Sequence, residues 1–192
     1  MPSYTTMTSP WLKYRNNIYS QNGEDGVLHA IFRELKITPE WVCEFGTLDG
    51  QQYSNTFILV QRGVNAVYIE SSPAHFETLK KTCEPYPNVI TINKFVDYKG
   101  EDTLDNILSK TPIPKDFDIL SIDIDSSDYQ VWKSVELYNP KVVVIEIISS
   151  VVPHHITYIY DGVSYPGTGF NPMVILGMSK GYTLLCLSLI HI

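Results

Sequence analysis

Five short apolar runs alternate with amphipathic segments along the chain, and this alternation limits the possible folds more than any other feature of the sequence. The runs are rich in β-branched residues and almost continuous, which is typical of strands buried on both faces of a parallel sheet. They occupy residues 41–45, 66–70, 89–93, 117–123 and 141–148. The sequence therefore predicts an α/β fold with a doubly wound, mostly parallel sheet of the Rossmann-like kind.

The segments between the runs carry signals of helix starts and ends. A first helix is expected from Ser20 through "GVLHAIFRELK", and Pro73 suits the first turn of a later helix. A final helix, "NPMVILGMSK", is expected before a sixth strand at residues 182–186. The side chains placed to cap the other helices are Ser54, Asp128 and either Asp102 or Thr103.

The size and charge of the chain exclude some classes of protein. With 192 residues, 44% of them hydrophobic, the chain suits one globular domain. The formal net charge of -7 and the absence of a Lys/Arg cluster make nucleic acid an unfavourable partner. The three cysteines are scattered, and no uncharged apolar stretch is long enough to span a bilayer. We therefore expect a cytoplasmic protein without a membrane segment.

A carboxylate precedes a glycine loop in the stretch "WVCEFGTLDGQQYSN", where Glu44 ends the first run and Gly46 and Gly50 follow it. Loops of this kind usually cradle phosphate, because backbone amides and a helix N-terminus attract anions. Glu44 would repel a phosphate. S-adenosylmethionine carries a sulfonium and an ammonium group and has no phosphate, so the pattern favours this cofactor.

Acidic residues also end three of the other apolar runs. Ligands of parallel α/β sheets bind beyond the carboxyl ends of the strands, so Glu70, Asp123 and Glu146 are candidate site residues. Glu70 is placed to accept hydrogen bonds from ribose hydroxyls. Asp123 and Glu146 are the candidate catalytic residues, and Asp123 is expected to touch the acceptor or the methyl end of the donor. We assign no metal ligands, although the acids of "SIDIDSSD" leave a divalent cation as an option.

Several stretches together carry a resemblance to a known family. They are "YSQNGEDGVL", "EFGTLDGQQYSNT", "YIESS", "FDILSIDIDSSDYQVW" and "PKVVVIE", in this order. The chain resembles a group of class I S-adenosylmethionine-dependent methyltransferases related to the FkbM-type domain. The resemblance covers residues 19–186, which leaves 1–18 as an N-terminal extension. It implies a seven-stranded sheet and O-methylation of a small molecule or a sugar.

The resemblance also implies which residues surround the cofactor. The residues expected around the methionyl group are Glu44, Gly46, Asp49 and Gly50. Glu70 and Ser71 are expected at the ribose, and Phe95, Val96 and Asp97 at the adenine. Phe95 and Val96 would contact the adenine ring, and Asp97 its exocyclic amine. Asp123 completes this set from the far side of the glycine loop.

One long irregular stretch, at about 149–169, is a candidate lid over the acceptor, because long connections in compact domains are commonly functional. His154 and His155 within it are able to act as general bases near neutral pH. Solvated loop histidines are more common than catalytic ones, however. Tyr158, Tyr160 and Tyr165 are candidates for an aromatic wall.

The last six residues, "LSLIHI" at 187–192, are expected to be non-native. They match the translation of a transposase adapter used in sequencing libraries. The family places a seventh, antiparallel strand beside the sixth, and nothing after Cys186 can form it. We therefore expect a domain that lacks its final strand, and a natural gene product that continues past Cys186.

Two other functions stay open. A nicotinamide-dependent oxidoreductase would also use a glycine loop and an acid on the second strand, but Glu44 and the missing GxGxxG motif count against it. A non-catalytic ligand-binding module would bind the donor without transferring its methyl group. The sequence does not identify the methyl acceptor or the oligomeric state.

Overall fold

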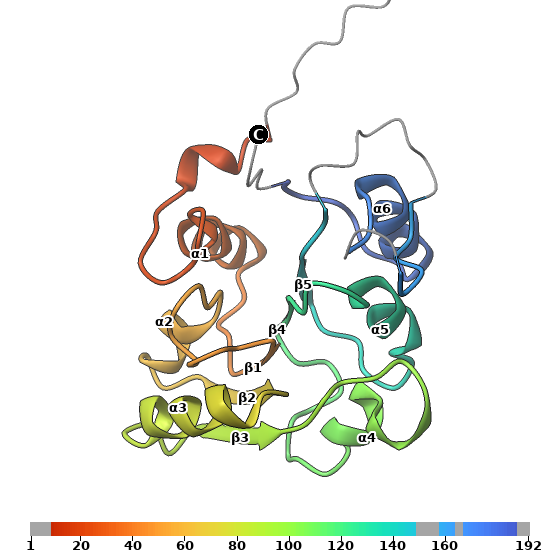
Figure 1. The fold of residues 1–192 in the computed structure, drawn as a ribbon. Helices are drawn as coiled ribbons and strands as arrows, with labels where there is room; N and C mark the ends of the chain where they lie inside the picture. Colours follow the sequence, from red (N-terminus) through yellow and green to blue (C-terminus); the bar gives the residue numbers. More distant parts are fainter. Residues whose placement is uncertain (1–8, 149–157, 164–166, 188–192) are drawn as a thin grey trace, which may run out of the picture.

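A five-stranded parallel sheet forms the centre of the protein (Figure 1). The computed structural model describes residues 9–148, 158–163 and 167–187. The strands lie in the order β3-β2-β1-β4-β5, with β1 in the middle. Their bounds are β1 Trp41–Phe45, β2 Asn65–Glu70, β3 Val89–Asn93, β4 Ile119–Ile122 and β5 Val142–Ile145. The five apolar runs of the sequence are thus confirmed as strands.

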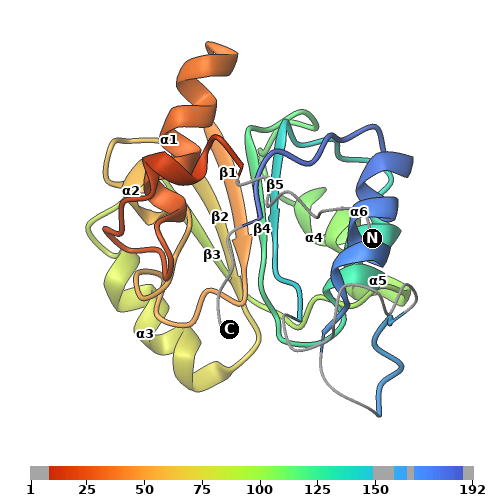
Figure 2. The same cartoon turned by 90° about the horizontal axis from the view of Figure 1, so that it is seen from above.

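Helices cover both faces of the sheet, as Figure 2 shows from above. On one face lie α1 Glu24–Leu35, α2 Phe57–Val60 and α3 Pro73–Cys83. On the other lie α4 Leu104–Leu108, α5 Asp128–Ser134 and α6 Phe170–Ser179. Two short 3-10 helices span Leu12–Tyr14 and Gly100–Asp102. The predicted α/β, doubly wound, Rossmann-like architecture is confirmed.

The two layers of helices produce two apolar cores. On the α1–α3 side, Phe32 and Leu79 pack with Phe57 and Tyr68. On the α4–α6 side the core includes Phe117 and many partners from the sheet and helices. Neighbouring residues of one strand enter opposite cores, as Val42 and Cys43 do, and both are fully buried. Burial on both faces explains why these strands appear as continuous apolar runs.

The caps of the helices agree with the sequence at α3 and α4. Pro73 begins α3, and Thr103 is the N-cap of α4, with its hydroxyl accepting from the N–H of Asn106. The prediction for Ser54 is wrong: the N-cap of α2 is Thr56, although the Ser54 hydroxyl accepts from the N–H of Phe57. The prediction for Asp128 is wrong. Asp128 is the first residue of α5 rather than its N-cap, and its carboxylate accepts from the backbone of the preceding loop.

The predicted sixth strand is not formed. Residues 182–187 have no strand structure, and within the described part of the chain β5 pairs with β4 alone. A strand needs a neighbour to satisfy its backbone groups, and this segment pairs with none of the described strands. The Ser9 hydroxyl ties it to the N-terminal region by donating to the Leu185 carbonyl at 2.8 Å. No helix in the described ranges is both long and apolar enough to cross a membrane.

Candidate functional site

A cavity of about 880 Å³ opens at the carboxyl ends of β1, β2, β4 and β5 and continues along the length of β5, with residues of α1 and α6 in its wall. This is the edge at which parallel α/β sheets bind their ligands. The expected site residues that line it are Glu44, Gly46, Glu70, Ser71, Phe95, Val96, Asp123 and Glu146. The structure therefore brings most of the expected residues to one place. Their roles toward a cofactor stay predictions.

Three expected cofactor residues do not line the cavity: Asp49, Gly50 and Asp97. The Asp49 carboxylate accepts from the N–H groups of Gln51 at 2.9 Å and Gln52 at 2.7 Å, so it stabilises the turn of the glycine loop. The Asp97 carboxylate accepts from the N–H of Tyr98 at 2.6 Å. Backbone amides of their own loops thus occupy both carboxylates.

Glu44 ends β1 and is buried, with 5% of its surface exposed. Its Oε1 atom accepts hydrogen bonds from the Asn55 N–H at 2.9 Å and from the Ser121 hydroxyl at 3.2 Å. Its Oε2 atom accepts from the hydroxyls of Ser54 at 2.6 Å and Thr56 at 2.5 Å. Burial raises the pKa of Glu44, and these hydrogen bonds oppose the rise. Because a carboxylate has about four acceptor positions, the chain itself occupies all of them.

Close packing requires glycine at both positions of the loop, which the sequence did not show. Gly46 has a φ of +78°, and a Cβ at this position would lie 1.7 Å from the Asp123 carbonyl oxygen. Gly50 has a φ of +83°, and its Cβ would lie 2.5 Å from Leu79 in α3. The sequence placed these glycines around the methionyl group, where the absence of a Cβ would let the backbone approach a cofactor. In the structure they let the loop approach β4 and α3.

Glu70 ends β2 and holds two neighbouring loops in place. Its Oε2 atom accepts from the N–H of Leu48 at 2.9 Å, and its Oε1 atom from the N–H of Ser72 at 2.7 Å. Each oxygen retains a second acceptor position. Glu70 also lines the cavity, so its carboxylate is placed to bind a ligand with hydroxyl groups.

An apolar surface lies next to Glu70, after β3. Phe95 is 59% exposed and Val96 is buried, and both line the cavity. Lys94, between them and the strand, forms an ion pair with Asp102 at 2.5 Å. An exposed aromatic ring at the wall of a cavity suits a flat apolar ligand group such as a purine.

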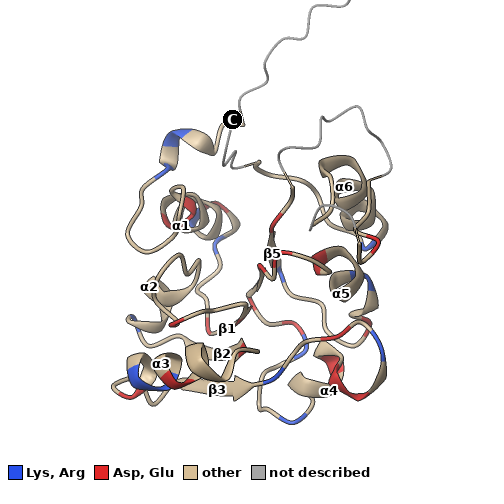
Figure 3. Cartoon of the chain, in the orientation of Figure 1, with Lys and Arg blue, Asp and Glu red and all other residues tan. Residues whose placement is uncertain are grey.

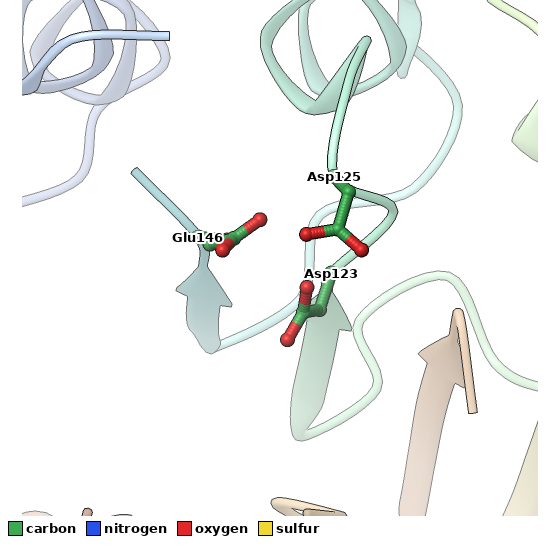
Figure 4. Close-up of side chains that lie close together, drawn as sticks. All are labelled: Asp123, Asp125 and Glu146. Atoms are coloured by element: carbon green, nitrogen blue, oxygen red, sulfur yellow. The ribbon is translucent and has the colours of Figure 1, made fainter. Parts of the chain in front are cut away.

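Three carboxylates face one another at the ends of β4 and β5 (Figure 4). Oxygen atoms of Asp123, Asp125 and Glu146 all lie within 4.8 Å of one another. Asp128, which the sequence grouped with the first two, is buried and bonded to the loop backbone instead. The three clustered acids are able to share one proton or to hold a divalent cation.

The crowding of these acids changes their ionisation. Loss of hydration in the crowded site, followed by repulsion from Asp125 and Asp128, raises the pKa of Asp123 to about 7. Partial burial, followed by repulsion from Asp123, raises the pKa of Glu146 to about 8. Asp123 and Glu146 are hydrogen-bonded to each other. Near neutral pH the pair therefore both binds and releases a proton.

Negative charge dominates the whole cavity, and Figure 3 shows acidic positions gathered beside β5. The carboxylates that line it are Glu24, Glu44, Glu70, Asp123, Asp125 and Glu146. Among the described residues, the basic ones that line it are Lys94 and Lys141, and each is ion-paired with an aspartate, Asp102 and Asp118 respectively. The cavity is therefore built for a ligand that carries positive charge.

Two residues of the cavity wall were missed by the sequence analysis. Gln21 and Glu24 come from the loop before α1 and its first turn, and both line the cavity. The motif "SQNGED" supported the family resemblance, but nothing in its spacing indicated that it lines the same cavity as the glycine loop. Only the packing of the chain brings these distant segments together.

The candidate lid is only partly described. His154, His155 and Tyr165 lie outside the described residues, so their roles stay predictions. Tyr158 and Tyr160 are described and do not line the cavity. The Tyr160 carbonyl accepts a hydrogen bond from the Gln130 side chain at 2.6 Å.

No family model matches this chain, and no curated protein sequence does. Among solved structures, it is similar to the PH0226 protein from Pyrococcus horikoshii OT3, with 15% identity, a TM-score of 0.48 and coverage of 80% of this chain and 77% of that chain. It is also similar to the CcbJ methyltransferase from Streptomyces caelestis, with 19% identity, a TM-score of 0.42 and coverage of 72% and 58%.

A third similar structure is coclaurine N-methyltransferase bound to N-methylheliamine and SAH. Its identity is 13%, its TM-score is 0.40, and the match covers 73% of this chain and 46% of that chain. The chain thus spans less than two thirds of this structure and of the CcbJ methyltransferase. At these identities the likeness is one of fold alone.

Proposed function

We propose that the protein is an S-adenosylmethionine-dependent methyltransferase that acts on a hydroxyl group of a small molecule or a sugar. The observation that carries this proposal is the charge of the cavity, where carboxylates outnumber lysines among the described residues and both lysines are ion-paired. A sulfonium cofactor is attracted by such a cavity, whereas the pyrophosphate of a nicotinamide dinucleotide is repelled. The charge of the cavity thus speaks against the oxidoreductase.

The walls of the cavity suit the separate parts of this cofactor. Glu70 offers its remaining acceptor positions to the ribose hydroxyls, and Phe95 with Val96 offers an apolar surface to the adenine. Bound S-adenosylmethionine supplies an electrophilic methyl group. The residues of the chain then have to align the acceptor and remove its proton.

The Asp123–Glu146 pair is the proposed base. Both residues line the cavity at the ends of neighbouring strands, and the raised pKa values of about 7 and about 8 lie close to neutral pH. A general base works best when its pKa is near the operating pH. The deprotonated member accepts the hydroxyl proton of the acceptor, and the pair holds that proton between its two carboxyl groups.

Binding of S-adenosylhomocysteine, the demethylated product, tests the proposal by calorimetry. The parent chain is expected to bind it, and Glu70→Ala is expected to weaken binding by about 1.5 to 3 kcal/mol, typical of hydrogen bonds to a charged group. Glu77→Ala, at an exposed acid of α3, is the control and should leave the affinity unchanged. If the parent and the Glu70 variant bind with equal affinity, Glu70 is not part of the site. If the parent does not bind S-adenosylhomocysteine, the proposed cofactor is wrong.

A second experiment separates an enzyme from a binding module. The protein is incubated with isotopically labelled donor and a metabolite extract, and products are examined by mass spectrometry for added methyl groups. A labelled product supports a methyltransferase and identifies the acceptor. Donor binding without a labelled product from any extract favours a non-catalytic module.

A further inference from the structure

We propose that the loop before α1 binds the amino-acid end of the donor, with the Glu24 carboxylate on its ammonium group and the Gln21 amide on its carboxylate. This inference rests on the proposed function and assigns a role to residues 18–26. The amino-acid end is the part of the cofactor to which the proposed contacts of Glu70 and Phe95 do not extend.

The loop is braced so that these two side chains stay at the cavity. Asp25 is 4% exposed, and its Oδ2 atom accepts from the N–H groups of Ile18 at 2.9 Å, Tyr19 at 2.8 Å and Ser20 at 2.9 Å. A Cβ on Gly26 would lie 2.0 Å from the Tyr14 carbonyl, so the preceding segment packs directly on the helix. The acid and the glycine of this motif are therefore architectural, whereas Gln21 and Glu24 face the cavity.

The position of the loop matches the methionyl end of the site. The Tyr19 ring packs edge-on against Phe57 at the start of α2, with 5.0 Å between ring centroids. The segment 51–56 separates the glycine loop from α2, and Gln21 and Glu24 line the same cavity as Gly46 and Leu48 of that loop. The carbonyl of Gln21 accepts from Asn17 at 2.9 Å, so the backbone at this point is also held.

The other carboxylates of the cavity suit other parts of the site. Glu44, which the sequence assigned to the methionyl group, has all its acceptor positions filled by the chain itself. Glu70 is at the end of β2, where the ribose is expected, and the cluster of Asp123, Asp125 and Glu146 is at the expected methyl-transfer end. Among the described residues, Glu24 is the remaining carboxylate of the cavity wall, and we assign it to the methionyl end.

Two ligands that differ only at the amino-acid end make the test specific. S-adenosylhomocysteine carries the ammonium and carboxylate groups, whereas 5′-methylthioadenosine has the same nucleoside and thioether without them. Calorimetry measures both ligands against the parent chain, Glu24→Gln, Gln21→Ala and the control Glu34→Gln. Glu34 is an exposed acid on the same helix that does not line the cavity.

Glu24→Gln is expected to weaken S-adenosylhomocysteine binding at least about tenfold, because it removes a hydrogen bond between charged groups. Gln21→Ala should weaken it by a smaller factor. Neither variant should change the affinity for 5′-methylthioadenosine, and Glu34→Gln should change neither ligand. Thermal unfolding of each variant shows whether it folds, and the glutamine of Glu24→Gln can still accept from the Asn22 N–H as Glu24 does.

The outcomes separate this inference from the proposed function. Unchanged binding of S-adenosylhomocysteine to Glu24→Gln would overturn the inference, and so would an equal loss of affinity for both ligands, since the loop would then act only through the fold. In both cases the proposed function stands, because the parent chain binds the product. If the parent binds neither ligand, the proposed function fails and the inference fails with it.

Discussion

Two acidic places at the same edge of the sheet have opposite surroundings. Glu44, at the end of β1, is buried and accepts four hydrogen bonds from its own chain. Asp123 and Glu146, at the ends of β4 and β5, have each other and further acids as neighbours, and they line the open cavity. One carboxylate is thus surrounded by donors, and the other two are surrounded by like charge.

The difference shows which acid stabilises the structure. A buried carboxylate with all acceptor positions filled stabilises the loop that donates to it, and removing it leaves unpaired donors. Carboxylates that repel one another lower the stability of the folded chain, and such arrangements are concentrated at functional sites. The sequence pattern does not show this difference in surroundings, because Glu44, Asp123 and Glu146 all lie at or near the end of an apolar run. Three changes would break or sharpen this contrast.

Gly46→Ala is expected to have the largest effect, because Gly46 closely follows Glu44 in the chain and packs against the backbone of Asp123. Its new Cβ would meet the Asp123 carbonyl oxygen at 1.7 Å, and its φ of +78° is unfavourable for alanine. We expect a loss of roughly 2 to 5 kcal/mol in the free energy of unfolding, from overpacking and from the left-handed backbone. Chemical denaturation measures it.

Gly63→Ala is the matched control for this change. Gly63 has a similar φ of +89°, but nothing lies within 4 Å of the place that a Cβ on this residue would occupy. This variant should therefore lose only about 1 to 2 kcal/mol, which is the cost of the backbone conformation. Equal losses at the two positions would show that contact with Asp123 is unimportant.

Glu44→Gln comes next and compares the two acidic places directly. The amide NH₂ group cannot accept hydrogen bonds, so two of the four donors around Glu44 lose their partner. We expect a loss of about 2 to 3 kcal/mol in unfolding free energy. Asp123→Asn, the same kind of change at β4, should leave stability unchanged or raise it at neutral pH. If Asp123→Asn proves the more destabilising of the two, the contrast is wrong.

The last test is the dependence of stability on pH. Folding raises the pKa of Asp123 from 3.8 to about 7 and that of Glu146 from 4.5 to about 8. The folded chain therefore binds more protons than the unfolded chain in this interval, so its stability falls as pH rises from about 4 to about 8. Denaturant titrations at several pH values should show this slope, and the double variant Asp123→Asn with Glu146→Gln should flatten it. An equal slope in both proteins would argue against a shared proton.

The strands could be predicted because their burial is nearly uniform. The bounds expected for β1 and β3 are those of the structure. The fourth run was expected from residue 117, but β4 begins at Ile119, and the Asp118 carboxylate just before it accepts from the N–H groups of Glu40 and Trp41. The sixth strand at 182–186 failed because a strand depends on a neighbour that the local pattern does not reveal.

The site could be predicted only where topology alone decides it. Acids at the ends of parallel strands have to meet at one edge, so the expectation that Glu70, Asp123 and Glu146 lie in one cavity agrees with the structure. The position of a loop side chain depends on the hydrogen bonds of its own turn, and Asp49 and Asp97, which bond to their own loops, do not line the cavity. Gln21 and Glu24 were missed because no local signal shows that two distant segments line the same cavity.

The central position of β1 affects how the chain folds during synthesis. β1 is made first, and one of its edges pairs with β2, the next strand along the chain. Its other edge pairs with β4, where Val42 is paired with Ile119, which is synthesised much later. Contacts between distant segments form slowly, because the loop must be closed before they are gained. In a nascent chain, the second edge of β1 therefore cannot be paired with β4 until Ile122 has left the ribosome.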